Sequence, residues 1–106
     1  MKSEVATPES ALPDRKRLLE AKITVPDHVV HRAFVSETVV LNLKTGIYHG
    51  LNATAGRMLE LLQETGSFGE TADRLVVEYN QTAVEIHQDL RMLCGELLQR
   101  ELIELS

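Results

Sequence analysis

The chain of 106 residues has no tryptophan, one cysteine and three prolines, and only 4% of its residues are aromatic. The single cysteine, Cys94, cannot form an internal disulfide, so we expect it to be a small core residue in a reducing compartment. No apolar run reaches the length that crosses a bilayer, and the N-terminal residues lack the apolar stretch of a signal peptide. These absences predict a soluble, cytoplasmic protein with no membrane partner.

Positive charge is also scarce. The 11 Lys and Arg residues face 16 Asp and Glu residues, which gives a formal net charge of -5. Such a balance repels a phosphate backbone, so we expect no nucleic-acid partner. A chain of this length forms one domain that does not easily enclose a deep active-site cleft, which favours a small binding module over an enzyme.

The residue types that carry chemistry do not form a recognisable constellation. No Ser-His-Asp or Cys-His arrangement has a supporting context, and no glycine-rich loop is placed to hold a phosphate. The four histidines lack the cysteine or carboxylate pair that would complete a tetrahedral metal site. We therefore predict no catalytic residue, no metal and no cofactor.

The first 22 residues are polar and contain Pro8 and Pro13, with a short helical possibility at 15–21. They are predicted to form a flexible N-terminal arm outside the core, followed by a domain at 23–106. From residue 29 the chain is β-prone, and 38–43 has the alternating pattern of a half-buried strand. A turn ending at Gly46 leads into a strand at 47–51, which predicts a three-stranded antiparallel meander.

Helix signals follow the meander without a long loop. Asn52 can cap a first helix that ends at Gly66, and Ser67 with Glu70 has the spacing of a capping box for a second helix. Thr82 with Glu85 predicts another capping box, which opens a long third helix with a broad apolar stripe. The last residues, 102–105, form either its final turn or a short strand.

A three-stranded meander needs helices to cover one face, so the pattern predicts an α+β domain of the winged-helix kind. In a meander the third strand, 47–51, pairs only with the strand before it. Its outer amides and carbonyls are left without partners. Solvent, another copy of the chain or a ligand peptide must cover that edge.

The chain combines several motifs in one order: a strand, TGIYxGLNxT, a helix, SFxETADRLVxEY, and a capped helix ending in LLQRELIE. This order, over residues 25–105, resembles the PqqD-like family of leader-peptide recognition proteins, also called RiPP recognition elements. Within it the chain is most similar to the free-standing proteins of lasso-peptide biosynthesis, which work alongside a leader peptidase and a cyclase. The resemblance implies a non-catalytic protein that binds the leader of a ribosomally made precursor peptide.

In the family the leader adds as a strand to the edge of the small sheet, and its side chains enter a groove beside the third helix. The resemblance therefore places the peptide-binding site at Ile47, Tyr48 and His49 of the edge strand and at Ala83, Ile86, His87, Asp89 and Leu90 of the third helix. We expect Leu90→Asp to abolish leader binding and to leave the fold intact.

Other interpretations of these residues stay open. Tyr48 can be a core aromatic or a ligand contact, Ile86 and Leu90 can be plain core, and His87 can be solvated. The chain could also be a winged-helix DNA-binding transcriptional regulator, although the third helix carries Glu85, Asp89 and Glu96 against Arg91 alone. Two further alternatives are a PqqD-type chaperone for a radical maturation enzyme and a homodimer formed through the open sheet edge.

Overall fold

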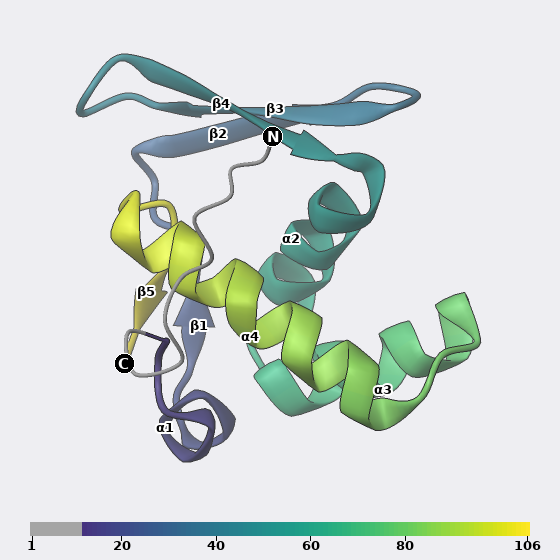
Figure 1. The fold of residues 1–106 in the computed structure, drawn as a ribbon. Helices are drawn as coiled ribbons and strands as arrows, with labels where there is room; N and C mark the ends of the chain where they lie inside the picture. Colours follow the sequence, from purple (N-terminus) through teal and green to yellow (C-terminus); the bar gives the residue numbers. More distant parts are fainter. Residues whose placement is uncertain (1–11) are drawn as a thin grey trace.

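The computed structural model describes residues 12–106 of the chain. Its elements, in chain order, are α1 (Arg15–Glu20), β1 (Ile23–Thr24), β2 (Val29–Ala33), β3 (Glu37–Asn42), β4 (Ile47–Asn52), α2 (Ala53–Thr65), α3 (Phe68–Tyr79), α4 (Ala83–Gln99) and β5 (Glu104–Leu105). Strands β2, β3 and β4 form an antiparallel sheet in that order, and all the helices lie on one side of it (Figure 1). The predicted α+β, winged-helix-like fold with a three-stranded meander is therefore confirmed.

The sheet has an inner face toward the helices and an outer face away from them. Val40, in the middle of β3, lies opposite His31 of β2 and His49 of β4. Because successive side chains of a strand point to opposite faces, this register fixes the two faces. The inner face carries the buried residues Val29, Thr38, Val40, Asn42 and Leu51, and the outer face carries Val30, Arg32, Val39, Leu41 and Tyr48.

The helix ends follow the capping signals of the sequence. The side chain of Asn52 accepts a hydrogen bond from the backbone N–H of Ala55 at the start of α2, and Gly66 ends this helix in a left-handed conformation with φ of 67°. Thr82 and Glu85 form the predicted reciprocal capping box of α4. The predicted box at Ser67 is only half formed, because the N–H of Ser67 donates to the hydroxyl of Thr65.

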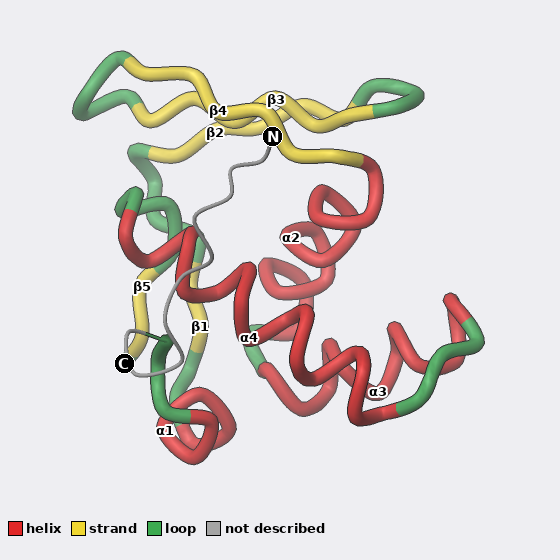
Figure 2. Tube along the Cα trace, in the orientation of Figure 1, coloured by secondary structure: helices red, strands yellow, loops and turns green. Residues whose placement is uncertain are grey.

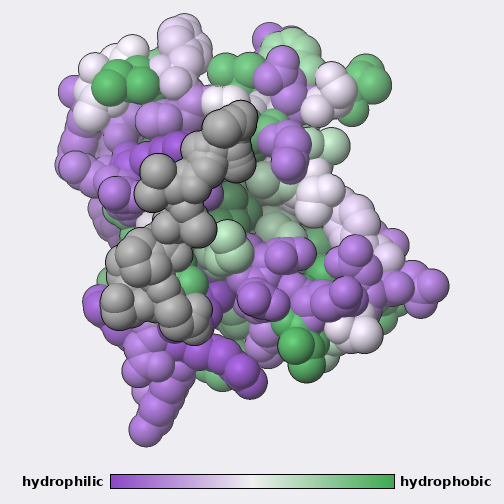
Figure 3. Space-filling view, in the orientation of Figure 1, coloured by the Kyte–Doolittle hydropathy of each residue, from purple (hydrophilic) through white to green (hydrophobic). Residues whose placement is uncertain are grey.

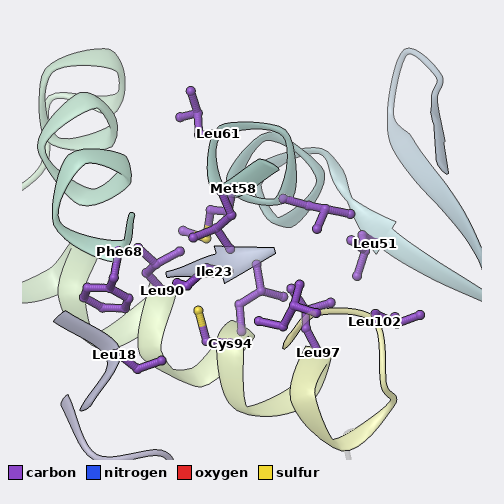
Figure 4. Close-up of a cluster of buried hydrophobic side chains, with 14 of the residues drawn as sticks. Leu18, Ile23, Leu51, Met58, Leu61, Phe68, Leu90, Cys94, Leu97 and Leu102 are labelled. Carbon is purple, nitrogen blue, oxygen red and sulfur yellow. The ribbon is translucent and has the colours of Figure 1, made fainter. Parts of the chain in front are cut away.

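The core lies between the sheet and the helices and collects apolar side chains from almost every element (Figure 4). Its largest fully buried side chains are Leu18, Ile23, Leu59, Leu61, Leu62, Phe68, Leu75, Ile86, Leu90, Leu97, Leu102 and Ile103. Burial of each such side chain stabilises the fold by roughly 1.5 to 3 kcal/mol. Most apolar side chains of α4 are therefore buried in the core and are not available to a ligand.

A second, two-stranded sheet joins the two ends of the described chain (Figure 2). Ile23 of β1 pairs with Leu105 of β5, so the last residues form the short strand and not a final helical turn. The N–H of Ser106 also donates to the carbonyl of Lys22, and the N–H of Lys22 donates back to the carbonyl of Ser106. The pairing of this strand with β1 was not expected from the sequence, since strands of two residues are too short to show an alternating hydrophobic pattern.

The predicted N-terminal arm covers residues 1–22, of which residues 1–11 lie outside the described residues. In the remainder, the short helix predicted at 15–21 is confirmed as α1, which Asp14 caps. Leu18 of this helix is 0% exposed and belongs to the core. The expectation that the arm stays outside the core is therefore wrong for α1, because Leu18, the one buried residue of this helix, anchors it in the core. The division into an arm and a domain otherwise stays a prediction.

Candidate functional site

The edge of the sheet at β4 is open in the part of the chain that the structure describes, because β4 pairs with β3 alone. Hydrogen bonds at the two ends of the β2–β3 ladder show which residues of β3 direct their backbone groups toward β2; we call this alternation the phase of the ladder. The N–H of Phe34 donates to the carbonyl of Glu37, and the N–H of Leu43 donates to the carbonyl of His28. Backbone groups alternate in direction along a strand, so residues 37, 39, 41 and 43 face β2. The residues between them face β4.

This phase determines which backbone groups of β4 point outward. Residues 38, 40 and 42 of β3 lie opposite residues 51, 49 and 47 of β4, whose N–H and C=O groups therefore point back to β3. The N–H and C=O groups of Tyr48 and Gly50 point to the open edge. An incoming extended peptide would find its hydrogen-bonding partners on these two residues.

The side chains of β4 fall on both sides of this edge. Ile47 and His49 project from the inner face, and Ile47 remains 54% exposed although it faces the helical side. Tyr48 projects from the outer face and is 68% exposed. The interpretation of Tyr48 as a core aromatic is therefore wrong, whereas its role as a ligand contact stays a prediction.

The C-terminal end of α4 lies near the three-stranded sheet. Asp89, Leu93, Glu96 and Arg100 recur at helical spacing and share one stripe. At the end of this stripe the carbonyl of Arg100 accepts a hydrogen bond of 3.2 Å from the side-chain amide of Asn42, an inner-face residue of β3. This contact brings the C-terminal end of α4 close to the inner face of the sheet.

The stripe combines an almost buried apolar residue with acidic groups. Leu93 retains slight exposure, and Asp89 and Glu96 are exposed on either side of it. In the space-filling view, apolar residues gather in the recess between the sheet and α4 (Figure 3). Leu93 and Glu96 were not among the residues that the sequence indicated, although their spacing from Asp89 was a usable signal.

The other α4 residues that the resemblance indicated lie elsewhere. Ile86 and Leu90 are buried in the core, and Leu90 lies close to Phe68 (Figure 4). His87 packs edge-on against Phe68 at 5.4 Å between ring centroids, and its buried Nδ1 has no hydrogen-bond partner among the described residues. Ala83 is exposed in the first turn of α4. Of these residues, only Asp89 shares the stripe of Leu93 and Glu96.

The burial of Leu90 changes one expectation. An aspartate at this position would put a carboxylate in an apolar core without a partner, which destabilises a fold strongly. The expectation that Leu90→Asp leaves the fold intact is therefore wrong. Variants that test a peptide site must instead change exposed residues.

The described residues show no activated nucleophile at Cys94. Burial raises the pKa of the Cys94 thiol to about 12, so at neutral pH it is protonated. Within residues 12–106, no three His, Cys, Asp or Glu side chains lie close enough to hold a metal ion. The helices of the same residues are all too short or too polar to cross a membrane.

Comparison with known proteins agrees with this geometry. The family described as "Coenzyme PQQ synthesis protein D (PqqD)" matches residues 37–103, from β3 to the end of the helical region. The solved structure of TbiB1 in complex with the TbiA(beta) leader peptide is 34% identical, with a TM-score of 0.71, and the match covers 76% of this chain and 94% of that one.

A second solved structure, lasso peptide synthetase B1 complexed with the leader peptide, has a TM-score of 0.70 over 79% of this chain and 99% of that one. Its 21% identity supports the shared fold alone. No curated protein is significantly similar to the chain. The family match covers more than half of the 106 residues, and the identity to TbiB1 extends over nearly all of that protein. The chain therefore belongs to the PqqD family.

Proposed function

We propose that this protein binds, without catalysis, the leader region of a ribosomally synthesised precursor peptide of the lasso-peptide type. The leader adds as a fourth strand along β4 and places side chains against the α4 stripe. The observation that carries this proposal is the open edge of β4, where the backbone groups of Tyr48 and Gly50 point outward. Similarity to TbiB1, which was solved with a leader peptide, supports the same conclusion.

Backbone pairing cannot supply the affinity by itself. Two outward residues offer on the order of four hydrogen bonds, each worth about 1 kcal/mol net. Ordering five leader residues costs roughly 5 to 10 kcal/mol, which exceeds that gain. Two or three buried leader side chains at roughly 1.5 to 3 kcal/mol each must provide the remainder.

The exposed groups at the recess indicate which leader side chains fit. Ile47 of β4 is 54% exposed, and Leu93 of α4 retains 8% exposure. Asp89 and Glu96 add two carboxylates to the α4 stripe, and carboxylates form strong hydrogen bonds with Arg or Lys. A leader with apolar residues at alternate positions and one basic residue next to them matches this surface.

The protein acts as an adaptor in the cytoplasm. By holding the leader it raises the local concentration of the core peptide for a leader peptidase and a cyclase of the same pathway. In this role it needs no cofactor and no catalytic residue of its own. Its acidic α4 surface gives no support to binding in a DNA groove.

The experiment that tests this function is a titration of the ¹⁵N-labelled protein with synthetic leader peptides, followed by backbone-amide NMR. We expect shifts to concentrate at residues 47–52 and along the stripe from Asp89 to Arg100. A peptide of the same composition in scrambled order serves as the control. Shifts confined to other parts of the chain would contradict the proposed site.

The same open edge could pair with a second copy of the chain, and the titration should therefore include a size measurement. Sedimentation with and without leader peptide separates the two cases. A monomer that binds one peptide supports the adaptor function. A dimer that the peptide cannot dissociate would show that the edge serves self-association.

A further inference from the structure

Gly50 of β4 has no conformational reason to be a glycine. Among the described residues, the glycines with a positive φ are Gly46 and Gly66, so Gly50 has a backbone that other residues also adopt. The register of β3 with β4 runs unbroken through this position, and Gly50 therefore marks no bulge. Glycine is depleted in strands because it has no side chain to pack and loses more backbone freedom on folding than other residues.

Packing within the protein does not require this glycine either. Apart from its chain neighbours, a Cβ added at Gly50 would meet one atom within 4 Å, Oε1 of Glu37 at 3.6 Å, which is an ordinary van der Waals contact with the end of a flexible side chain. At Gly56, by contrast, a Cβ would overlap the side chain of Thr38. Glycine inside a strand also marks places where a ligand or another backbone approaches closely, which is the explanation left for Gly50.

The missing side chain leaves a space on the outer face of the sheet, which no described helix covers (Figure 1); we call this space the Gly50 gap. Val39 lies opposite Gly50 and bounds the gap on the side of β3. Tyr48, two residues earlier on the same face of β4, bounds it along the strand and is 68% exposed. The carboxylate of Glu37 lies above the gap. The Gly50 gap thus has two apolar sides and one anionic side, and it opens toward the free edge of β4.

The carboxylate of Glu37 is available to a ligand. Glu37 is exposed, and its side chain forms no ion pair or hydrogen bond with residues 12–106. Arg32, a cation on the same face of the sheet, has its guanidinium 5.9 Å from the ring centroid of Phe34 instead. A basic group that reaches Glu37 therefore meets a carboxylate without a competing partner in the described part of the chain.

A leader strand on β4 brings one of its side chains to this gap. The N–H and C=O groups of Gly50 point to the open edge, so a leader residue pairs directly with Gly50. Its side chain projects from the same outer face, with its Cβ about 4.5 to 5.5 Å from the Cβ position of Gly50. From there the aliphatic stem of Lys or Arg covers the gap beside Val39 and Tyr48, and the charged head reaches Glu37.

We propose that Gly50 and Glu37 form a specificity subsite for a basic leader side chain, an inference that rests on the proposed function and assigns the residue type at one leader position. The basic residue faces outward, whereas its two neighbours in the leader face the helical side of the sheet. The subsite also selects the register of the leader. A shift of the leader by two residues keeps the same side chains on each face but moves the cation away from Glu37.

The test is a charge swap between protein and leader. Synthetic leader peptides in which each residue in turn is replaced by Lys or by Glu are titrated into wild type and Glu37→Lys by calorimetry. We expect wild type to prefer Lys over Glu at one leader position by at least about threefold, and Glu37→Lys to reverse that preference. A nuclear Overhauser contact with Gly50 identifies this position. Glu104→Lys, which makes the same charge change in the two-stranded sheet, is the control and should leave the preference of wild type unchanged.

Filling the gap gives a second measurement. Gly50→Val should weaken leader binding at least about fivefold and should not lower the Tm, because valine favours strands and the protein itself leaves room for its Cβ. A lower Tm for Gly50→Val would assign the glycine to the fold and overturn its role in the subsite. Leader binding in which no position responds to Glu37→Lys overturns the subsite and leaves the proposed function standing. A wild-type protein that binds no leader overturns the proposed function itself.

Discussion

Proline at Tyr48 is the sharpest test of the β4 edge. The phase of the ladder directs the N–H of Tyr48 away from β3 and toward the place of the leader strand. Proline has no N–H and is tolerated on edge strands where that group faces solvent. Tyr48→Pro should therefore remove one hydrogen bond to the leader while leaving the ladder to β3 in place.

The size of the effect follows from that single bond. A backbone hydrogen bond contributes about 1 kcal/mol, which corresponds to roughly fivefold in the dissociation constant. The pyrrolidine ring also occupies space needed by the adjacent leader carbonyl, so we expect a loss of at least about fivefold by calorimetry. Tyr48→Ala, which keeps the N–H and loses the same side chain, is the reference for this comparison.

Proline at His49 provides the opposite control. The N–H of His49 points into the ladder, because His49 lies opposite Val40 of β3. His49→Pro should lower the Tm by at least about 10 °C, whereas Tyr48→Pro should stay close to Tyr48→Ala. Equal leader affinity in Tyr48→Pro and Tyr48→Ala would refute strand addition at β4. Equal loss of stability in both proline variants would refute the assigned phase.

Three further predictions test the fold around the site. A Cβ at Gly56 would lie 2.8 Å from Cβ of the buried Thr38 and closer still to its hydroxyl. Gly56→Ala should therefore lower the free energy of unfolding, measured in urea, by about 1 to 3 kcal/mol. Adding Thr38→Ala should restore part of this loss. Cys94 should resist alkylation in the native protein and react in urea, since it is buried and its pKa is raised to about 12; fast native labelling would contradict this burial. Hydrogen bonds from Arg57 hold the pKa of Glu78 below its usual 4.5, so this pair stabilises the protein above that pH and the stabilisation is lost as pH falls through the folded-state pKa. Glu78→Gln should cost at most about 1 kcal/mol near pH 7 for this partly exposed pair, and the cost should fall as the pH drops through the folded-state pKa of Glu78. A cost that does not change with acidification would contradict the assignment.

The meander and the long helices could be predicted because their signals are local. Alternation at 38–43, the glycine at position 46 and the caps at Asn52 and Thr82 each act within a few residues of the chain. The β1–β5 pair and the burial of α1 could not be predicted in this way. Both depend on contacts between segments far apart in sequence. Strands of two residues and a single buried leucine are too short to give a repeating hydrophobic pattern in the sequence.

The candidate site was only partly predictable for a related reason. The edge at 47–51 follows from strand order alone, so the sequence indicated it correctly. Which side of α4 faces that edge depends on the rotation of the helix about its axis. An apolar stripe such as Ile86 and Leu90 indicates the core side, whereas the contact of Asn42 with the carbonyl of Arg100 shows only that the C-terminal end of α4 lies near the sheet.

The proposed functions require β4 to keep one register, since a slip by one residue would exchange its two faces. The hairpin turn before β4 is organised by Asn42, which is fully buried at the end of β3. Its side-chain oxygen accepts from the N–H groups of Lys44 and Thr45, and its amide donates to the carbonyl of Arg100. One polar side chain thus joins the turn to the end of α4. Asn42 therefore holds the turn that sets the register of β4 and also ties the sheet to the C-terminal end of α4.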